Sequence, residues 1–435
     1  MYRKDGRMGG YVVVGGQWGD EGKGKIVDVL AKKAAYVVRF QGGNNAGHTV
    51  VVNNQKHILH LLPSGVLHAQ ATCIIGAGVV VDPFVLLEEM AMLEKMHICI
   101  DHIQISDRAH LIMPYHVKMD RLEEERKKEK KVGTTQRGIG PCYSDKYLRI
   151  GLRMCDLIDF ESFKKKLKYI LQIKNEQIEK IYHEKGFVYE EMVEKFAYVQ
   201  EQLKNRLVDS FLVLQKAYEK DQFVLFEGAQ AAMLDINYGN YPYVTSSSPT
   251  SGVVCSGAPV PPHHIKRIIA VVKAYSTRVG EGPFVCEQNN EMGAYLRKVG
   301  NEYGATTGRE RRCGWLDLVI VKHAIAYNGA HTLVLTKLDV LSSLKKIPIC
   351  VAYEIEGEIV DFLIADTQKM AKAKPIYESM EGWQEDISHI QNYEDLPINC
   401  KKYIEKIEQV CKVSVSMISL GPQRENNLYI HDIFI

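Results

Sequence analysis

The sequence predicts an α/β fold with a large, mostly parallel central sheet flanked by helices, a nucleotide site like that of P-loop NTPases, and one helical insertion. Three observations predict it. Short β-rich runs alternate with helical patterns along all 435 residues, which we expect to form a single α/β domain, 1–435. Several of these runs end in a loop rich in glycine or charge, where open α/β sheets place their ligands. The first such loop leads directly from a strand into a helix.

Eight strands are expected from runs of β-branched and aromatic residues bounded by glycine or charge. The runs are joined without any internal repeat or low-complexity linker. In chain order they cover residues 11–15, 36–40, 72–76, 103–106, 223–226, 268–274, 332–336 and 413–420.

Residues 160–220 are the predicted helical insertion. This stretch is rich in Lys, Glu and Leu at helical spacing and contains little glycine. The run 121–131 mixes Glu and Lys densely. Because its charges alternate in sign, a solvated helix face explains it better than a basic patch.

Composition excludes several classes of protein. Lys and Arg number 55 against 53 Asp and Glu, a net charge of +2, so we expect no nucleic-acid partner. Because no apolar run has the length of a membrane span and residues 11–14 are too few for a signal-peptide core, we expect no membrane partner either. The ten cysteines are scattered without a C-x-x-C pair. This pattern favours reduced thiols in the cytoplasm over a zinc site or a disulfide framework.

The first loop lies in the segment YVVVGGQWGDEGKGKIVDVLAKK. Its five glycines, from Gly15 to Gly24, can bring backbone N–H groups close to a ligand, and the helix expected at 26–33 adds a field that favours anions. Lys23 and Lys25 supply positive charge for phosphate oxygens. A glycine-rich turn with a structural aspartate is the alternative, but glycines, lysines and an acid together after a strand favour phosphate binding.

The loop nearly fits the Walker A pattern, with Gly19 followed by Gly24 and Lys25 at the required spacing. Position 26 is Ile26, however, where a Walker loop has a Ser or Thr hydroxyl for Mg²⁺. Asp20 is the candidate for holding the metal instead, since Mg²⁺ favours a carboxylate together with substrate phosphates.

A second glycine-rich loop, QGGNNAGHTV, follows the strand 36–40. Its glycines again imply a close approach of the backbone to a ligand, and Asn44, Asn45 and His48 are polar groups on what we expect to be a mobile turn. Single histidines are often structural, but this position makes His48 a candidate for stabilising a phosphoryl group or donating a proton to it. Asn45 is a candidate for reading a purine edge or a phosphate.

The pattern HTLVLTKLDVL places Lys337, Leu338 and Asp339 at the end of a buried strand. One carboxylate can accept hydrogen bonds from both N1–H and N2–H₂ of guanine, whereas adenine has no such pair of donors. The lysine stem can pack along the face of the base. A Lys-x-Asp turn without a ligand is a common alternative; combined with the phosphate loop, the pattern favours GTP.

Two further loops, GATTGRERRCGWLD and GTTQRGIGPCYSDKYLR, combine Gly, Thr and Arg, which suits the binding of a second, anionic substrate. A solvated basic turn is the alternative for either loop. Gln230 in FEGAQ and Thr245 in YPYVTSSS are weaker signals. The polar residues of the two loops are Thr306, Thr307, Arg309, Arg311 and Arg312 in the first, and Thr134, Thr135, Arg137 and Arg149 in the second.

Taken together, these segments resemble the adenylosuccinate synthetase family. The matching stretches extend from residue 12 to residue 425 and so cover essentially the whole chain. GDEGKGK, GATTGR and TKLD are highly specific as a set. The other matching stretches are QGGNNAGHTV, HLLPSG, GTTQRGIGP, FEGAQ, YPYVTSSS, KAYSTRVGEGPF and SLGPQRE.

The resemblance implies a ligase that makes adenylosuccinate, GDP and phosphate from IMP, L-aspartate and GTP, with one Mg²⁺ per subunit, in the first committed step from IMP to AMP. Because the 6-oxo group of IMP is a poor leaving group, a 6-phosphoryl-IMP intermediate is expected. Asp20 takes the N1 proton so that O6 attacks the γ-phosphate. Lys23 balances charge on the phosphate, His48 acts as general acid toward GDP, and Gln230 supports the oxyanion at O6.

The resemblance also implies ligands residue by residue. For Mg²⁺ they are Asp20 and the Gly47 carbonyl. For GTP they are Gly19, Asp20, Glu21, Gly22, Lys23, Gly24, Lys25, Gly47, His48, Thr49, Arg311, Lys337, Leu338, Asp339, Ser419, Leu420 and Gly421. For IMP they are Asp20, Lys23, Asn45, Ala46, Gly47, His48, Thr135, Gln230, Thr245, Arg309 and, from the neighbouring subunit of a homodimer, Arg149. For aspartate they are Ala305, Thr306, Thr307, Gly308, Arg309 and Arg311.

Four positions depart from the commoner family pattern. Gln136 stands where Gly is frequent, Glu310 where Pro or Arg is usual, and Ala231-Ala232 in place of Gly-Thr. Because Glu310 lowers the positive charge of the aspartate loop, aspartate affinity is the property we expect to differ.

Two other functions are alternatives to the ligase. A GTP-binding switch would use the same phosphate loop and TKLD element, but it has no need of a second anion site. A dinucleotide-dependent oxidoreductase would need an acidic ribose anchor about 20 residues after the first loop, where the sequence has Arg39-Phe40-Gln41.

Overall fold

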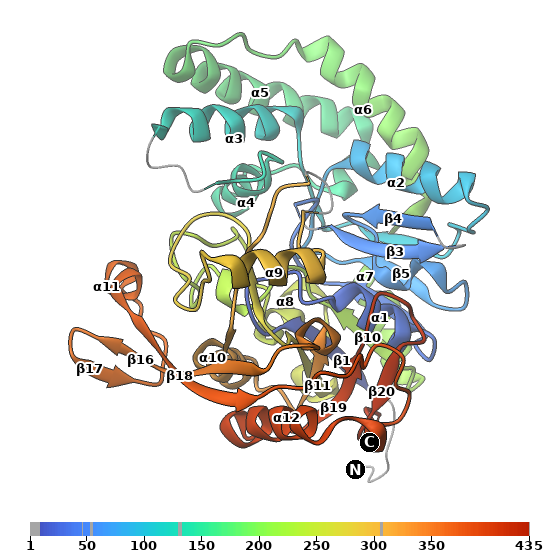
Figure 1. Ribbon diagram of the computed structural model, residues 1–435. Helices are drawn as coiled ribbons and strands as arrows, with labels where there is room; N and C mark the ends of the chain where they lie inside the picture. The colour runs from blue at the N-terminus through green and yellow to red at the C-terminus, as the bar shows by residue number, and fades with distance from the viewer. Residues whose placement is uncertain (1–8, 46, 53–54, 129–132, 305–307, 435) are drawn as a thin grey trace.

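A ten-stranded sheet forms the centre of the computed structural model, in the order β20-β19-β15-β11-β1-β10-β2-β5-β7-β9 (Figure 1). The structure describes residues 9–45, 47–52, 55–128, 133–304 and 308–434, and only the backbone of 48–52 and 55–57. Neighbouring strands are parallel except for β19 and β20, which are antiparallel. The mostly parallel α/β fold predicted from the sequence is thus confirmed.

All eight predicted strands lie in this sheet, with ends that differ by up to three residues. Two short edge strands, β9 and β20, were not predicted because two or three residues carry too little pattern. The strands are β1 Gly10–Gly15, β2 Tyr36–Arg39, β5 Thr72–Ile75, β7 Ile103–Ser106, β9 Leu207–Val208, β10 Val224–Glu227, β11 Ile265–Lys273, β15 Thr332–Thr336, β19 Val415–Ser419 and β20 Asn427–Tyr429.

Helices cover both faces of the sheet, so its central strands are apolar on both sides. In β1, Val12 and Val14 pack in one apolar cluster with residues of α10 and α12, whereas Tyr11 and Val13 pack in a second cluster with residues of α1 and α2. The helices are α1 Lys23–Ala31, α2 Pro83–Lys95, α3 Pro114–Arg126, α4 Ile139–Leu148, α5 Phe160–Tyr182, α6 Tyr189–Leu203, α7 Ser210–Glu219, α8 Val254–Gly257, α9 Glu291–Gly300, α10 Leu318–Asn328, α11 Thr367–Lys372 and α12 Ile398–Cys411.

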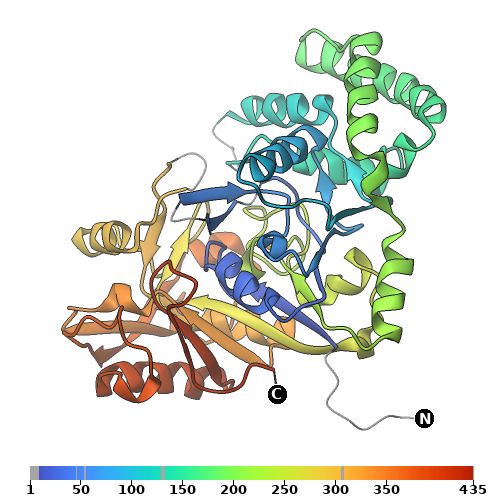
Figure 2. The same cartoon turned by 90° about the vertical axis from the view of Figure 1, so that its right-hand side faces the viewer.

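The stretch 160–220 is mostly helical but not entirely so. Helices α5 and α6 lie with α3 at one end of the molecule, away from the central sheet (Figures 1 and 2). Between α6 and α7 the chain returns to the sheet as β9, which pairs with β7. Leu214 and Ala217 of α7 pack in the apolar cluster that contains Val12. The insertion predicted to end at residue 220 therefore includes one strand, β9, and one helix, α7, that belong to the central layers.

Smaller sheets surround the central one. Strands β16, β17 and β18 extend from one side of the molecule beside α11 (Figure 1). The strands of the smaller sheets are β3 His48–Val52 with β4 Gln55–Leu59, β6 Val80–Val81 with β8 His110–Leu111, β12 Ser276–Arg278 with β13 Arg312–Gly314, and β14 Leu316–Asp317 with β16 Lys346–Ile355, β17 Glu358–Val360 and β18 Lys374–Glu381.

The order of the strands gathers the predicted loops at one edge. From β1 the chain continues through β2, β5, β7 and β9 on one side, then returns to place β10 beside β1 and continues through β11, β15 and β19 on the other. Because these strands are parallel, the segments after β1, β2, β10, β15 and β19 all leave the same edge of the sheet. Ligands of open α/β sheets bind at such a reversal of strand order. In the described part of the chain, no helix has the length and apolarity needed to cross a bilayer.

Candidate active site

The phosphate loop turns sharply between β1 and α1. Gly19, Asp20 and Gly22 all have positive φ, at 94°, 61° and 89°. Helix α1 begins at Lys23, with Gly22 as its N-cap, three residues earlier than the sequence predicted. The prediction failed because Gly24 reads as part of the loop, although it lies inside the helix. The first-turn amides of α1 therefore begin within the glycine-rich segment, as an anion site at a helix N-terminus requires.

Glu21 organises the inside of this loop. Its side chain is fully buried, and one oxygen accepts hydrogen bonds from the amides of Gln17 (3.1 Å) and Gly19 (2.8 Å). The other oxygen accepts from Lys23 Nζ at 2.6 Å. The Lys23 ammonium is thus held at the loop in the position predicted for a phosphate-binding lysine.

Lys25 lies elsewhere. Its ammonium donates hydrogen bonds of 3.1 Å to the carbonyls of Leu420, Gly421 and Asn426. Burial lowers the pKa of Lys25 to about 8, against the opposing effect of Asp339 and Glu425. Because an ammonium has three donors, these contacts occupy all of them. In this structure Lys25 therefore fastens α1 to the loop after β19 and does not face the phosphate loop.

Asp20 and Ile26 occupy the positions on which the metal prediction depends. Ile26 is fully buried in the apolar core, so no side chain at position 26 reaches a ligand. The Asp20 carboxylate is about one-third exposed and forms an ion pair with Arg311, with 2.8 Å between Oδ2 and Nε. This contact brings the arginine of the predicted aspartate loop to the phosphate loop.

A chain of amide side chains joins the second loop to the segment after β10. Gln41 Nε2 donates to Gln230 Oε1 (3.2 Å), and Gln230 Nε2 donates to Asn45 Oδ1 (2.9 Å). Asn45 Nδ2 in turn donates to Thr245 Oγ1 at 3.5 Å. Three residues expected to contact IMP therefore meet at one place, although Asn45 lies 185 positions before Gln230 and 200 before Thr245.

The rest of the second loop is built differently from a mobile turn. Asn44 is 2% exposed, and the His48 and Thr49 backbone belongs to β3. Arg39 anchors the loop by donating from NH2 to the Gly43 carbonyl at 2.7 Å. The side chains of His48 and Thr49, and residues Ala46, Ala305, Thr306 and Thr307, lie outside the part of the chain that the structure describes.

The predicted guanine site is linked to the phosphate loop. Thr336 Oγ1, at the end of β15, donates a 2.7 Å hydrogen bond to the Glu21 carbonyl. The Lys337 amide donates to the Ser419 carbonyl at 3.0 Å, which joins this turn to the end of β19. Among the described residues, Asp339 Oδ1 is buried without a hydrogen-bond partner. An unpaired buried carboxylate oxygen is costly, and a guanine N–H would satisfy it.

The predicted aspartate loop has a closed base. Tyr303 and Glu310 form an isolated β-bridge, and the Gly304 amide donates to the Arg309 carbonyl at 2.7 Å. Glu310 Oε2 lies 3.2 Å from Arg297 NH1 of α9. Because Arg297 compensates this carboxylate, Glu310 lowers the positive charge of the loop less than the sequence alone suggested.

The remaining departures from the family pattern have local explanations. Gln136 has φ of +55°, a conformation that favours glycine. Ala231 and Ala232 are fully buried beside β1, where a Cβ on Gly15 would lie 2.6 Å from that of Ala231. Their small side chains fit the close approach of this segment to the start of the phosphate loop.

Thr135 and Arg149 do not meet the rest of the site within one chain. Both are exposed. Arg149 follows the last residue of α4 with φ of +64°, after Tyr147 and Leu148, which are 78% and 61% exposed. An arginine beside two exposed apolar side chains is typical of a surface that a partner covers.

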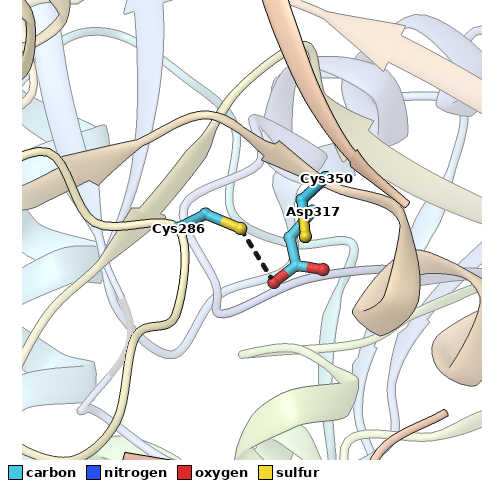
Figure 3. A group of neighbouring side chains, drawn as sticks. All are labelled: Cys286, Asp317 and Cys350. Carbon is cyan, nitrogen blue, oxygen red and sulfur yellow. Dashed lines mark hydrogen bonds between the residues drawn. The ribbon is translucent and has the colours of Figure 1, made fainter. Parts of the chain in front are cut away.

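Two of the ten cysteines, Cys286 and Cys350, meet Asp317 in the protein interior (Figure 3). One Asp317 oxygen accepts hydrogen bonds from two amides of the first turn of α10. The other accepts from Tyr353 Oη (2.6 Å) and Cys286 Sγ (3.3 Å). Burial raises the pKa of the Cys286 thiol well above its usual range. Four donors satisfy this carboxylate, so we interpret the cluster as a helix cap.

The sequence profile of the adenylosuccinate synthetase family matches residues 12–428. Adenylosuccinate synthetase of Fusobacterium nucleatum is 56% identical to the chain over 426 residues, which cover 98% of this chain and 100% of that protein. The enzyme of Desulforamulus reducens is 50% identical over 427 residues, with the same coverage. The chain belongs to the adenylosuccinate synthetase family.

Solved structures agree with this assignment. Fully ligated adenylosuccinate synthetase from Plasmodium falciparum superposes with a TM-score of 0.91 at 41% identity, covering 96% of this chain and 99% of that one. A cyanophage S-2L succinoaminodeoxyadenylate synthetase superposes with a TM-score of 0.60 at 17% identity, which shows the fold alone. As an adenylosuccinate synthetase family member, the chain is a GTP-dependent ligase of purine biosynthesis that joins IMP and L-aspartate.

Sequence reasoning missed the residues that hold the site together. Thr336, Arg39 and Glu302 are buried and contact the loops, but they were not named as site residues. Glu302 stands two residues before the stretch GATTGR, and a glutamate there beside a loop of arginines was the available signal.

Proposed function

We propose that the chain makes adenylosuccinate through a 6-phosphoryl-IMP intermediate, with the chemistry at the phosphate loop. The contact between Asp20 and Arg311 carries this proposal, because it joins the loop suited to phosphoryl transfer to the loop suited to an anionic amino acid. The Asn45, Gln230 and Thr245 side chains lie together as a polar site for IMP.

In the first step Asp20 accepts the proton of IMP N1, and O6 attacks the γ-phosphorus of GTP. The bond from O6 to phosphorus forms as the bond between phosphorus and the β–γ bridging oxygen breaks, which releases GDP. Lys23, held by Glu21, and the amides at the start of α1 balance charge on the transferred group. His48 donates a proton toward the leaving oxygen, and Gln230 supports the charge on O6.

The residues present fit a Mg²⁺ ion. Its preferred ligands are oxygens, usually one or two carboxylates with phosphates and water. Asp20, whose carboxylate is partly exposed, and the Gly47 carbonyl would hold one ion per subunit. When bound, the ion supplies positive charge against the phosphate oxygens of GTP.

In the second step the amine of L-aspartate attacks C6, and the C6–O bond breaks to release inorganic phosphate. The amine loses a proton, and adenylosuccinate remains. Arg309, Arg311 and the loop 305–308 bind the aspartate carboxylates, because guanidinium groups pair with carboxylates in a bidentate manner. We place the guanine of GTP between Lys337 and Asp339.

We also propose a cytoplasmic homodimer in which Arg149 reaches IMP in the partner's site. Arg149 is exposed and follows two exposed apolar residues, which supports its covering by a partner. Neither a nucleic acid nor a membrane is proposed as a partner.

The test is product formation from the three substrates. Purified protein with IMP, L-aspartate, GTP and Mg²⁺ should give the absorbance increase of adenylosuccinate, and leaving out any one substrate should give none. Hydrolysis of GTP at the same rate without IMP and aspartate would favour a GTP-binding switch and refute the ligase.

Asp20→Ala tests the base and the metal ligand together. Loss of general-base catalysis alone costs about 10²–10⁴-fold in rate, so we expect turnover below detection. Asp361→Asn is the control, since Asp361 forms an exposed ion pair with Lys322 and should leave kcat unchanged. Near-normal turnover by Asp20→Ala would refute the role.

A further inference from the structure

Glu302 is a buried carboxylate at which three cationic side chains meet. It is 0% exposed. Its Oε1 accepts hydrogen bonds from Lys273 Nζ (2.8 Å), Lys337 Nζ (2.9 Å) and the Tyr275 hydroxyl. Its Oε2 accepts from Arg311 NH1 at 2.8 Å. Lys337 is proposed to bind guanine, and Arg311 is proposed to bind the substrate anions. One carboxylate therefore contacts a side chain of each of these two parts of the site.

The backbone of Glu302 reinforces this arrangement. Its carbonyl accepts a 3.0 Å hydrogen bond from the Arg311 amide, so Glu302 fixes Arg311 through both main chain and side chain. The two residues close the base of the loop that contains residues 305–307. Lys337 Nζ also donates to the Gly300 carbonyl at 2.5 Å, which ties the turn after β15 to the end of α9.

Charges of both signs surround Glu302. Lys273, Lys337 and Arg311 carry three positive charges that contact its carboxylate, and Arg311 also pairs with Asp20. Burial alone would raise the pKa of Glu302, but the three cations hold that pKa far below its usual range. Glu302 is therefore an anion that is held by three cations.

We propose that Glu302 is a positioning residue that sets the geometry of Arg311 and Lys337. The side chains that bind aspartate and GTP are then held in place by the same buried carboxylate. This inference rests on the proposed function and deepens it. Asn45, Gln230 and Thr245 have no contact with Glu302 among those the structure describes, so we expect IMP binding to depend on Glu302 only indirectly, through Asp20 and Arg311.

Glu302→Gln keeps the size of the side chain and removes its charge. Charged hydrogen bonds are the stronger ones, and we expect the KM for aspartate and for GTP to rise about tenfold or more, with the KM for IMP within about twofold. GTP affinity measured by calorimetry should fall by a similar factor. Tyr275→Phe is the control, because it removes a hydrogen bond to the same oxygen without touching Arg311 or Lys337, and it should leave all three KM values unchanged.

The double variant Glu302→Gln/Lys273→Met distinguishes the positioning role of Glu302 from a purely structural one. This double variant also removes the buried cation of a pair that is 1% and 0% exposed, so its resistance to urea should return toward that of the wild type. The KM values for aspartate and GTP should remain raised. Wild-type KM values for aspartate and GTP in either variant would overturn the proposal. KM values that return to normal together with the resistance to urea would overturn it as well. Because calorimetry needs no turnover, a wild-type chain that binds GTP but makes no adenylosuccinate would refute the proposed function and leave this test intact.

Discussion

At the scale of single residues, Asp339 shows most clearly how burial creates specificity. One of its carboxylate oxygens is buried and has no hydrogen-bond partner in the described chain. Burial raises its pKa, against hydrogen bonding by the Gly421 amide. A group in this state gains most from a ligand that presents N–H donors to it, which guanine does and adenine does not.

Asp339→Asn should change the preferred nucleotide. The amide can still accept from N1–H, but its NH₂ faces the donor N2–H₂ of guanine, whereas xanthine presents an acceptor oxygen at that position. We expect kcat/KM for GTP to fall about 10–100-fold and XTP to become the better substrate. Steady-state kinetics with GTP, XTP and ATP measures this. Asp395→Asn, at an exposed aspartate, is the matched control, and an unchanged order of GTP over XTP would contradict the assignment.

The sequence predicted the place of a side chain where the local backbone determines it, and the roles proposed for these residues stay predictions. Asp20 and Lys23 follow from a strand, glycines and a helix start, all local features. The contacts of Lys25 could not be predicted in this way, because its long side chain reaches carbonyls nearly 400 positions away in the sequence. The meeting of Asn45, Gln230 and Thr245 also lies beyond local pattern, and only the family resemblance indicated it.

At the scale of elements, α1 connects the phosphate loop to the loop after β19 through Lys25. Apolar runs bounded by turn residues predicted eight of the ten strands of the sheet, but not the order of these strands. Strands β9 and β20 and the true start of α1 were missed, since tertiary pairing and the conformation of Gly22 determine them. The connection that Lys25 makes between α1 and the loop after β19 was likewise not predicted from the sequence.

The stability contributed by this connection should depend on pH. Burial lowers the pKa of Lys25 to about 8 in the folded chain, whereas an unfolded lysine titrates near 10.4. Between these values the unfolded chain binds a proton that the folded chain lacks, so stability rises with pH. Relative to Lys25→Met, the wild type should therefore gain about 1–2 kcal/mol in free energy of unfolding from pH 8 to about pH 10.

Urea unfolding of both proteins in steps of about one pH unit, from about pH 7 to about pH 10, measures this difference. Lys32→Met removes an exposed lysine that follows the last residue of the same helix and controls for the loss of a positive charge. A difference between wild type and Lys25→Met that stays flat over the whole range would show that the Lys25 ammonium remains charged in the folded protein.

At the scale of the whole molecule, one chain gathers nearly all of the proposed site at a single sheet edge. The phosphate loop, the amide cluster and the guanine turn meet there because β1, β2, β10, β15 and β19 are parallel and adjacent or nearly so. The ion pair between Arg311 and Asp20 brings the aspartate loop to the same place. The exceptions are the exposed Thr135 and Arg149, and Arg149 lies at the exposed end of α4. A residue that a single chain leaves out of its own site is explained if a symmetric partner supplies it.

Subunit mixing tests this arrangement. Arg149→Leu and Asp20→Ala should each be inactive alone, but a hybrid dimer has one site with both Asp20 and the partner's arginine intact. After dissociation in mild denaturant and reassociation of equal amounts, random pairing should restore about a quarter of wild-type activity. Each variant carried through the same treatment alone should stay inactive. If the mixture also stays inactive while sedimentation shows that hybrids have formed, Arg149 acts within its own subunit and the shared site is wrong.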